Sequence, residues 1–167
     1  MPPPTLQTRS FSPLQDKLLN WYRKNKRTLP WRGYPDAYAV WVSEIMLQQT
    51  QVATVIDYYR RFIRAFPDIP ALAGADLQDV LKLWEGMGYY ARARNLHRAA
   101  RQLAAAGTAT VPGTPDAFRR LPGVGDYISA AVSSIAFGHS LPVADGNVKR
   151  VLARVFLIED PVNRASS

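Results

Sequence analysis

The chain has 167 residues, and 21 Lys and Arg against 13 Asp and Glu give it a formal net charge of +8 at pH 7. The absence of cysteine excludes disulfides, cysteine-ligated zinc and an iron–sulfur cluster within this chain, and two histidines are too few for a histidine-rich metal site. The composition is typical of one globular domain, and we expect no metal site and no membrane contact. The positive charge predicts an anionic partner such as nucleic acid, although it also promotes solubility alone.

The apolar periodicity predicts an all-α chain of some eight helices with short loops. Residues 1–11 are proline-rich and are expected to form a disordered tail. Thr50, Asp76, Asp126 and Asp145 are the expected caps of the helices that follow them. The expected helices cover about 13–26, 36–48, 52–66, 77–85, 90–106, 115–120, 126–137 and 146–157.

The segment Leu121-Pro-Gly-Val-Gly-Asp-Tyr127 lies between two predicted helices. Its glycines allow a close backbone approach to a partner, and the turn leads into a helix N-terminus, whose free N–H groups favour a phosphate. This pattern is typical of a helix-hairpin-helix motif, which holds a DNA backbone without reading its sequence. An ordinary turn between two helices has the same composition, so the segment alone leaves both interpretations open.

Two carboxylates are candidates for acid–base chemistry. Asp145 starts a predicted helix, whose dipole keeps a carboxylate ionised and suited to stabilise a cation developing on a sugar; a simple N-cap is the alternative. Glu44 lies among Trp41, Ile45 and Leu47. Apolar surroundings raise the pKa of a carboxyl, as a general acid requires, whereas a Glu on a solvated helix face stays ionised.

Two more segments carry side chains that suit DNA. Amide side chains can read base edges, and an aromatic side chain at a loop tip can wedge into a base stack. The amides are Gln48, Gln49 and Gln51, and the loop-tip aromatics are Tyr89 and Tyr90. The helix after these tyrosines has a basic face formed by Arg94, Arg98 and Arg101. Exposed amides, packing tyrosines and a solvated basic face are the alternative interpretation.

Five segments together match one family pattern. They are Leu29-Pro-Trp31, Ser43-Glu-Ile-Met-Leu-Gln-Gln-Thr-Gln-Val-Ala-Thr-Val55, Gly88-Tyr-Tyr-Ala-Arg-Ala-Arg-Asn-Leu-His97, Leu121-Pro-Gly-Val-Gly125 and Asp145-Gly-Asn-Val-Lys-Arg-Val-Leu-Ala-Arg154. From about residue 14 to 157 the chain closely resembles the MutY family of adenine DNA glycosylases, in the helix-hairpin-helix glycosylase superfamily. The resemblance implies the all-α fold of that superfamily.

The resemblance implies base excision repair of double-stranded DNA, by removal of adenine mispaired with 8-oxoguanine or guanine after the adenine flips out of the duplex. Glu44 matches the acid that protonates adenine at N7, and Asp145 matches the carboxylate that stabilises the sugar cation or traps it. Asn147 matches a residue that supports the aspartate. Tyr127 stands where endonuclease III-like relatives carry a Schiff-base lysine, so we expect monofunctional hydrolysis without an efficient lyase step.

The resemblance also implies residues that contact the DNA. Those near the flipped adenine are Arg32, Leu47 and Val52. Those at the opposite base are Gln49 and Tyr89, with Gln48 as their neighbour. Those at the DNA phosphates are Leu121, Gly123, Val124 and Gly125, with Lys149 nearby on the last predicted helix. Some relatives hold a monovalent cation at this hairpin.

The family carries more than this chain does. Its later helices bring four cysteines to a four-iron four-sulfur cluster, and a further domain recognises 8-oxoguanine. We therefore expect a truncated N-terminal part, without the cluster. The expected units are a disordered tail at 1–11, an N-terminal helix at 12–28 belonging to the incomplete cluster-side domain, a six-helix hairpin domain at 29–144, and at 145–167 the catalytic-Asp helix with the truncated start of the rest of the second domain.

Because this part of the family pattern is missing, three hypotheses are open for the isolated chain. It is an active or latent glycosylase, a DNA-binding module without catalysis, or a remnant that folds poorly. Apolar surface near Leu18, Trp21, Val151 and Phe156 is expected to be exposed, because the helices that cover it in the family are absent. We expect a monomer, and a cytoplasmic, nucleoid-associated location of the bacterial type.

Overall fold

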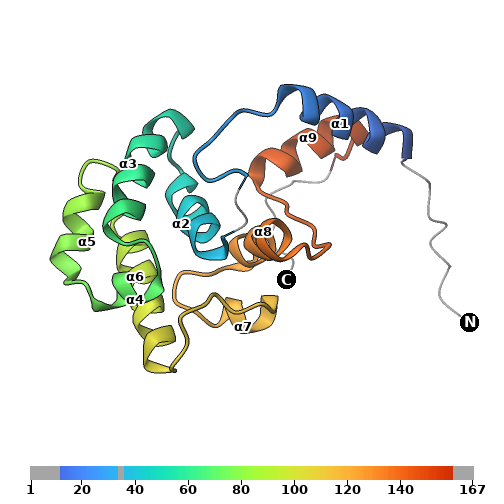
Figure 1. Cartoon of the computed structure of the whole chain (residues 1–167). Coiled ribbons are helices and arrows are strands. Elements are labelled where there is room, and N and C mark those ends of the chain that lie inside the picture. The colour runs from blue at the N-terminus through green and yellow to red at the C-terminus, as the bar shows by residue number, and fades with distance from the viewer. Residues whose placement is uncertain (1–11, 34–35, 160–167) are drawn as a thin grey trace, which may run out of the picture.

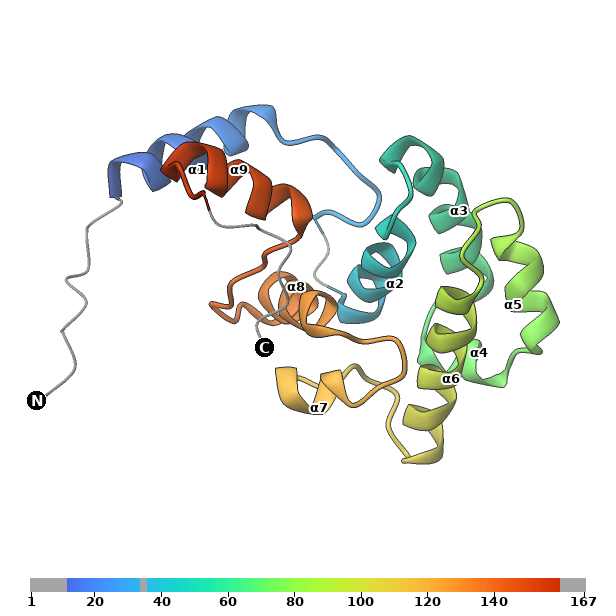
Figure 2. The ribbon, with the colours of Figure 1, turned by 180° about the vertical axis from the view of Figure 1, so that it is seen from behind.

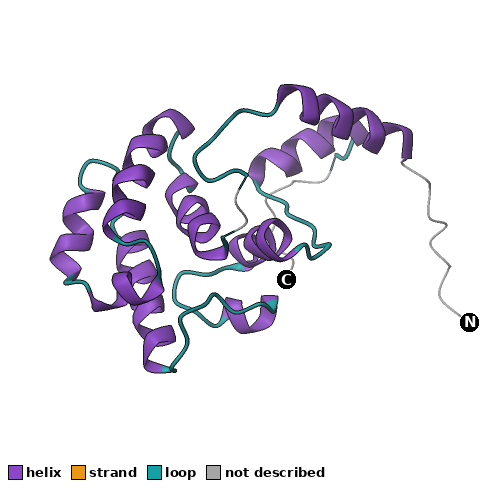
Figure 3. Cartoon of the chain, in the orientation of Figure 1, coloured by secondary structure: helices purple, strands orange, loops and turns teal. Residues whose placement is uncertain are grey.

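The computed structural model describes residues 12–33 and 36–159. Within them the chain forms nine α-helices and no strand, so the all-α prediction is confirmed (Figures 1 and 3). The helices are α1 (Ser12–Asn25), α2 (Ala37–Leu47), α3 (Val52–Ala65), α4 (Ile69–Gly74), α5 (Leu77–Trp84), α6 (Ala91–Ala105), α7 (Pro115–Arg119), α8 (Asp126–Phe137) and α9 (Gly146–Phe156). The predicted disordered tail at 1–11 and the end of the 145–167 unit lie outside the described residues.

Two of the predicted helix caps are confirmed. The side chain of Asp76 accepts a hydrogen bond from the Gln78 N–H at the start of α5, and that of Asp145 accepts one from the Val148 N–H at the start of α9. A carboxylate at this position satisfies an N–H group that has no partner inside the helix. The cap of α9 therefore fixes the place of one predicted catalytic carboxylate.

The other two predicted caps are wrong. The residue that caps α3 is Gln51, while the Thr50 hydroxyl donates to the Gln48 carbonyl. The residue that caps α8 is Gly125, while Asp126 forms an ion pair with Arg119. In both places the side chain that local preference assigns to the cap has a different partner.

The short helix α4 was not predicted, and it makes nine helices where some eight were expected. It is only six residues long, too short for a periodic apolar pattern. Asp68 caps it by accepting from the Ala71 N–H, and Pro70 stands in its first turn. With α4 included, the unit expected at 29–144 contains seven helices, α2 to α8, where six were predicted.

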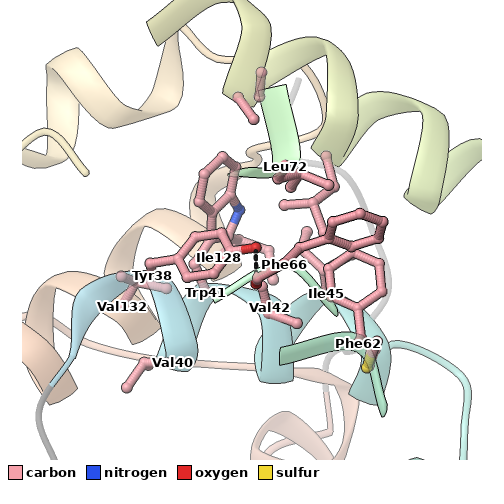
Figure 4. Close-up of a cluster of buried hydrophobic side chains, with 14 of the residues drawn as sticks. Tyr38, Val40, Trp41, Val42, Ile45, Phe62, Phe66, Leu72, Ile128 and Val132 are labelled. Atoms are coloured by element: carbon pink, nitrogen blue, oxygen red, sulfur yellow. Dashed lines mark hydrogen bonds between the residues drawn. The ribbon is translucent and has the colours of Figure 1, made fainter. Parts of the chain in front are cut away.

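Helix α2 occupies the centre of the molecule, with α3, α6 and α8 packed around it (Figure 1). It is apolar on all sides, as expected for a helix with little solvent contact. Trp41 is fully buried and meets Phe118 of α7 edge to face, with ring centroids 5.3 Å apart. The Tyr38 hydroxyl donates to the Phe66 carbonyl at the end of α3 (Figure 4). This rigid centre holds the last turn of α2, where Glu44 lies.

Helices α1 and α9 lie at the same end of the molecule, apart from the bundle around α2 (Figures 1 and 2). Neither helix has a buried apolar side chain among its described residues. Leu18, Trp21, Val151 and Phe156 are between 45% and 61% exposed, so the predicted apolar surface is confirmed. Within the described residues no helix is long and apolar enough to cross a membrane.

Candidate active site

Two adjoining cavities lie beside the last turn of α2, and Glu44 and Leu47 line both. The larger, about 530 Å³, is lined by Glu44, Leu47, Gln48, Gln49, Tyr89, Ala91, Arg92, Tyr127, Asp145 and Asn147. The smaller, about 250 Å³, is lined by Tyr22, Arg27, Leu29, Trp31, Arg32, Val40, Ser43, Glu44, Leu47, Val52 and Ile135. The four predicted catalytic residues and the three predicted opposite-base residues thus line the larger cavity together. The three predicted adenine-pocket residues line the smaller cavity.

Glu44 is half-buried at the boundary between the two cavities. Burial raises the pKa of its carboxyl, because a charge is poorly solvated there. The nearby charge of Asp145 raises it further, whereas the Tyr127 hydroxyl, which donates to Glu44 Oε2 at 3.2 Å, and the Arg32 guanidinium lower it. Burial is the largest of these effects, so Glu44 keeps its proton to a higher pH than an exposed glutamate does, as suits an acid.

Asp145 faces the same cavity from the start of α9, in a different environment. Its carboxylate accepts from the Val148 N–H at 2.7 Å and from the Asn147 side chain at 3.2 Å. Hydrogen bonds to the ionised form lower the pKa of Asp145, with the bond from Val148 the largest cause. The Arg150 guanidinium donates to Asn147 Oδ1 at 2.8 Å and fixes the amide that supports Asp145.

The pKa values of the two carboxyls are therefore shifted in opposite directions across one cavity. The pKa of one is raised by burial, and that of the other is lowered by hydrogen bonds at a helix N-terminus. Tyr127 lies beside them, and burial raises its pKa to about 12, so its hydroxyl is neutral and able to donate at neutral pH. A protonated carboxyl beside a carboxylate is the arrangement that glycoside hydrolysis uses.

The far rim of the larger cavity carries Gln49 and Tyr89 in left-handed backbone conformations, with φ of 55° and 50°. Residues other than glycine seldom adopt these angles, and the conformation costs free energy that surrounding contacts must offset. Both side chains are exposed, and that of Tyr89 is 61% exposed. The rim thus presents an amide and an aromatic ring to solvent from two different loops.

Arg92 holds these two loops together, and the sequence prediction missed it. One guanidinium nitrogen donates to the carbonyls of Ile45 (3.1 Å), Met46 (2.9 Å) and Gln48 at the end of α2. The other donates to the Thr50 hydroxyl (3.1 Å) and to the carbonyls of Met87 (3.4 Å) and Gly88 (3.2 Å). The guanidinium also lies over the rings of Trp84 and Tyr89. The rim on both sides of the cavity is therefore fixed by one cation.

A signal for Arg92 was present in the chain. It stands four, seven and eight residues before Leu96, Ala99 and Ala100, which line the buried side of α6. An arginine in register with a buried stripe needs acceptors inside the protein. Burial lowers the pKa of Arg92, and the carbonyls at the end of α2 supply the acceptors that the helix itself leaves free.

The predicted hairpin forms the turn between α7 and α8 and lines neither cavity. Leu121 and Val124 are buried, and their N–H groups already donate to the carbonyls of Phe118 and Leu121. Gly123 has φ of +77°, and a Cβ there would lie 2.7 Å from the Cβ of Asn95 on α6, so only glycine fits. Within the described residues the N–H groups of Gly123 and Gly125 donate to no backbone carbonyl, so they can donate to an acceptor outside the protein.

Other predicted contacts lie outside the cavities. Lys149 is exposed on α9 and lines neither of them. In the described part of the chain no three His, Asp or Glu side chains gather as metal ligands do. A cation at the hairpin stays a prediction.

Comparison with known proteins places this chain in a family. Residues 42–165 match the family described as HhH-GPD superfamily base excision DNA repair protein. The chain is 48% identical over 159 residues to the adenine DNA glycosylase of Mus musculus, with 89% of this chain and 31% of that protein covered. It is 44% identical over 142 residues to the adenine DNA glycosylase of Buchnera aphidicola (Baizongia pistaciae), with 84% and 40% covered. It spans about a third of the length of the curated relatives it matches.

Solved structures agree with the fold. A thermostable thymine-DNA glycosylase superposes with a TM-score of 0.78 at 28% identity, covering 83% of this chain and 64% of that one. A trapped endonuclease III–DNA covalent intermediate gives a TM-score of 0.75 at 22% identity, covering 88% and 69%. The match over residues 42–165 contains the hairpin, the rim and both carboxyls. The chain belongs to the HhH-GPD superfamily of base excision DNA repair proteins.

Proposed function

We propose that this chain is the catalytic part of an adenine DNA glycosylase that removes adenine mispaired with 8-oxoguanine or guanine. The observation that carries the proposal is the pair of carboxyls with opposite pKa shifts in one cavity, Glu44 raised and Asp145 lowered. The relatives named adenine DNA glycosylases support the choice of base.

In this proposal the adenine leaves the duplex and enters the smaller cavity, whose apolar wall includes Leu47 and Val52. Glu44 gives its proton to N7 of adenine, which makes the base a better leaving group. The N-glycosidic bond then breaks with its electron pair on the base. The sugar is left with oxocarbenium charge, which the Asp145 carboxylate stabilises. Water adds to the sugar carbon and gives a proton to the Glu44 carboxylate, which restores the acid, so the products are free adenine and an abasic site.

The DNA would be held outside the cavities. The N–H groups of Gly123 and Gly125 suit a phosphate, and the buried side chains of Leu121 and Val124 anchor the turn that presents them. Gln49 and Tyr89 stand at the rim, where they would fill the gap left by the flipped base and contact the opposite 8-oxoguanine or guanine.

Hydrolysis without a lyase step is part of the proposal. A lyase step needs an amine that forms a Schiff base with the sugar. None of the ten residues that line the larger cavity is a lysine, and Tyr127 is a neutral phenol that donates to Glu44. The chain has no cysteine, so its residues do not fit a cysteine-ligated iron–sulfur cluster, and no step here depends on one.

One observation favours a second candidate, a DNA-binding module without turnover. Asp145 stands on α9, and that helix has no buried residue among those described. A catalytic carboxylate on a helix that packs little against the rest of the protein is less firmly placed than one on α2. In this candidate the hairpin and rim bind DNA, while Asp145 is not held well enough for chemistry.

Single-turnover release of adenine from a duplex with one adenine opposite 8-oxoguanine separates the two candidates. Glu44→Gln is the matched control, because it keeps the size of the side chain and removes the acid. The glycosylase proposal predicts release by the wild type, a loss of about 100-fold or more in Glu44→Gln, and similar DNA binding by both. Binding without release in either form would support the module, and equal release by both would refute the acid role of Glu44.

A further inference from the structure

A third cavity lies along α6, shares no lining residue with the two cavities of the candidate active site, and has a volume of about 420 Å³. It is lined by Leu77, Arg94, Asn95, His97, Arg98 and Arg101. The three arginines are exposed, and their spacing of four and three residues places them on one face of the helix. The buried imidazole of His97 forms a hydrogen bond with the Ala75 carbonyl at 3.0 Å. The side chains of this cavity that are free to meet an anion are therefore the three arginines.

The charge of these arginines is not neutralised inside the protein. Within residues 12–33 and 36–159 the ion pairs are Arg60–Asp57 and Arg119–Asp126, and neither involves α6. Arg98 donates to Asn95 Oδ1 at 3.2 Å, which is a neutral amide. Like charges one helical turn apart destabilise a helix. A face that keeps three such charges therefore suits an external anion.

The position of this arginine face connects it to the proposed DNA site. Ala91, one turn before Arg94, lines the catalytic cavity. Asn95 lies against Gly123 of the hairpin, where an added Cβ would come within 2.7 Å of it. At 1.5 Å per residue, Arg101 lies about 15 Å along the helix from Ala91. The arginine face therefore starts one turn from the larger cavity, passes the hairpin and continues beyond it.

The chemistry of the face selects the anion. A guanidinium donates two parallel hydrogen bonds to a phosphate, and duplex DNA presents a row of phosphates rather than one charge. A row of three guanidiniums along a helix matches such a row better than it matches a single small anion. Because the face adjoins both the hairpin and the catalytic cavity, the same duplex is in reach of all three.

We propose that the arginine face of α6, formed by Arg94, Arg98 and Arg101, binds backbone phosphates of the duplex whose adenine occupies the active site. The face extends the hairpin's phosphate grip along the DNA and rests on the proposed function. It gives no base specificity, because its partners are phosphates.

The test replaces all three charges, in Arg94→Gln/Arg98→Gln/Arg101→Gln, and measures binding to an A:8-oxoguanine duplex over a series of salt concentrations. The matched control is Arg60→Gln/Arg61→Gln/Arg64→Gln, which removes three exposed arginines from α3 and lowers the net charge equally. Each lost phosphate contact makes the slope of log affinity against log salt shallower by about 0.9. We expect a slope about 2.7 shallower for the α6 variant, if each arginine holds one phosphate, and little change for the control.

Phosphate ethylation interference with the same proteins locates the contacts. The proposal predicts that the α6 variant loses interference at a short run of phosphates on one side of the adenine, while those at the hairpin remain. If the α3 control loses as much affinity as the α6 variant, the effect comes from net charge alone and the proposal is overturned. If the triple variant unfolds, Arg98→Gln alone must lower the slope by about 0.9, and an unchanged slope refutes the inference.

The outcomes separate this inference from the proposed function. If the wild type binds DNA and releases adenine but the α6 variant binds with the wild-type slope, the arginine face is refuted and the glycosylase proposal stands. If the α6 variant loses slope while neither protein releases adenine, the phosphate contacts stand and the catalytic proposal falls. If the wild type does not bind the duplex, both are refuted.

Discussion

Replacing Arg92 by Met tests how the rim of the cavity is held. Methionine keeps much of the length of the side chain but removes every donor. The carbonyls of Ile45, Met46, Gln48 and Gly88 then lose the guanidinium, and the first two have no other donor in their helix. A buried polar group left without a partner costs about 1–3 kcal/mol.

The structure limits how large the total effect can be. Water in the open cavity can solvate part of the exposed carbonyls. The variant also avoids the free-energy cost of burying the charged guanidinium, which is the cost that lowers the pKa of Arg92. We therefore expect Arg92→Met to lower the free energy of unfolding by about 3 kcal/mol, nearer to the loss of one or two hydrogen-bond partners than to all six. Equilibrium unfolding in urea measures this value.

Two controls make the result specific. Arg101→Met removes an exposed arginine from the same helix, and surface substitutions of this kind change stability by within about 0.5 kcal/mol. Arg92→Lys keeps a charge but lacks the planar fork, so we expect it to restore only part of the loss. An Arg92→Met protein as stable as Arg101→Met would refute the conclusion that Arg92 fixes the two loops.

Three other substitutions follow from the charge states of the cavity. Burial raises the pKa of Glu44, so ionisation of this carboxyl destabilises the folded protein as the pH rises. In thermal unfolding, Glu44→Gln should match the stability of the wild type below about pH 4 and exceed it at pH 8. An equal difference at both pH values would contradict this. Asp145→Asn keeps an N-cap for α9 but removes the charge of the side chain. The circular dichroism spectrum should therefore be unchanged, while the rate of single-turnover adenine release falls by about 100-fold or more. A near-normal rate of release would argue against electrostatic stabilisation of the sugar cation by Asp145. Tyr127→Phe removes a hydrogen bond that lowers the pKa of Glu44, so the alkaline limb of the pH–rate profile should move to higher pH, and a shift to lower pH is the opposing result.

Periodicity and local chemistry predicted most of the fold because they act over a few residues. The buried stripe of α3 and the caps at Asp76 and Asp145 depend on neighbours within one or two helical turns. The features that were missed depend on partners in other elements. Asp126 does not cap α8, and its carboxylate instead pairs with Arg119 at the end of α7.

In the candidate site, too, the residues with a distinctive local sequence could be predicted, and those defined by distant contacts could not. Glu44 and Asp145 could be singled out because each has a distinctive local setting, and the family resemblance linked them. Whether Glu44 was buried or solvated could not be decided from the chain, since the cavity around it includes Tyr127 and Asp145, which are 83 and 101 residues away (127 − 44 and 145 − 44). Arg92 was missed although it is in register with the buried stripe of α6, because its acceptors at the end of α2 are carbonyls more than forty residues earlier, and carbonyls leave no mark in a sequence.

The pH dependence of single-turnover adenine release tests most directly whether Glu44 and Asp145 act in opposite charge states. With the A:8-oxoguanine duplex at saturating protein, the rate should rise as Asp145 ionises at low pH and fall as Glu44 loses its proton, above the pH at which an ordinary glutamate ionises. The alkaline limb should disappear in Glu44→Gln. A wild-type rate that stays constant or increases with pH through neutrality, or the same alkaline limb in Glu44→Gln, would contradict the two-carboxyl mechanism.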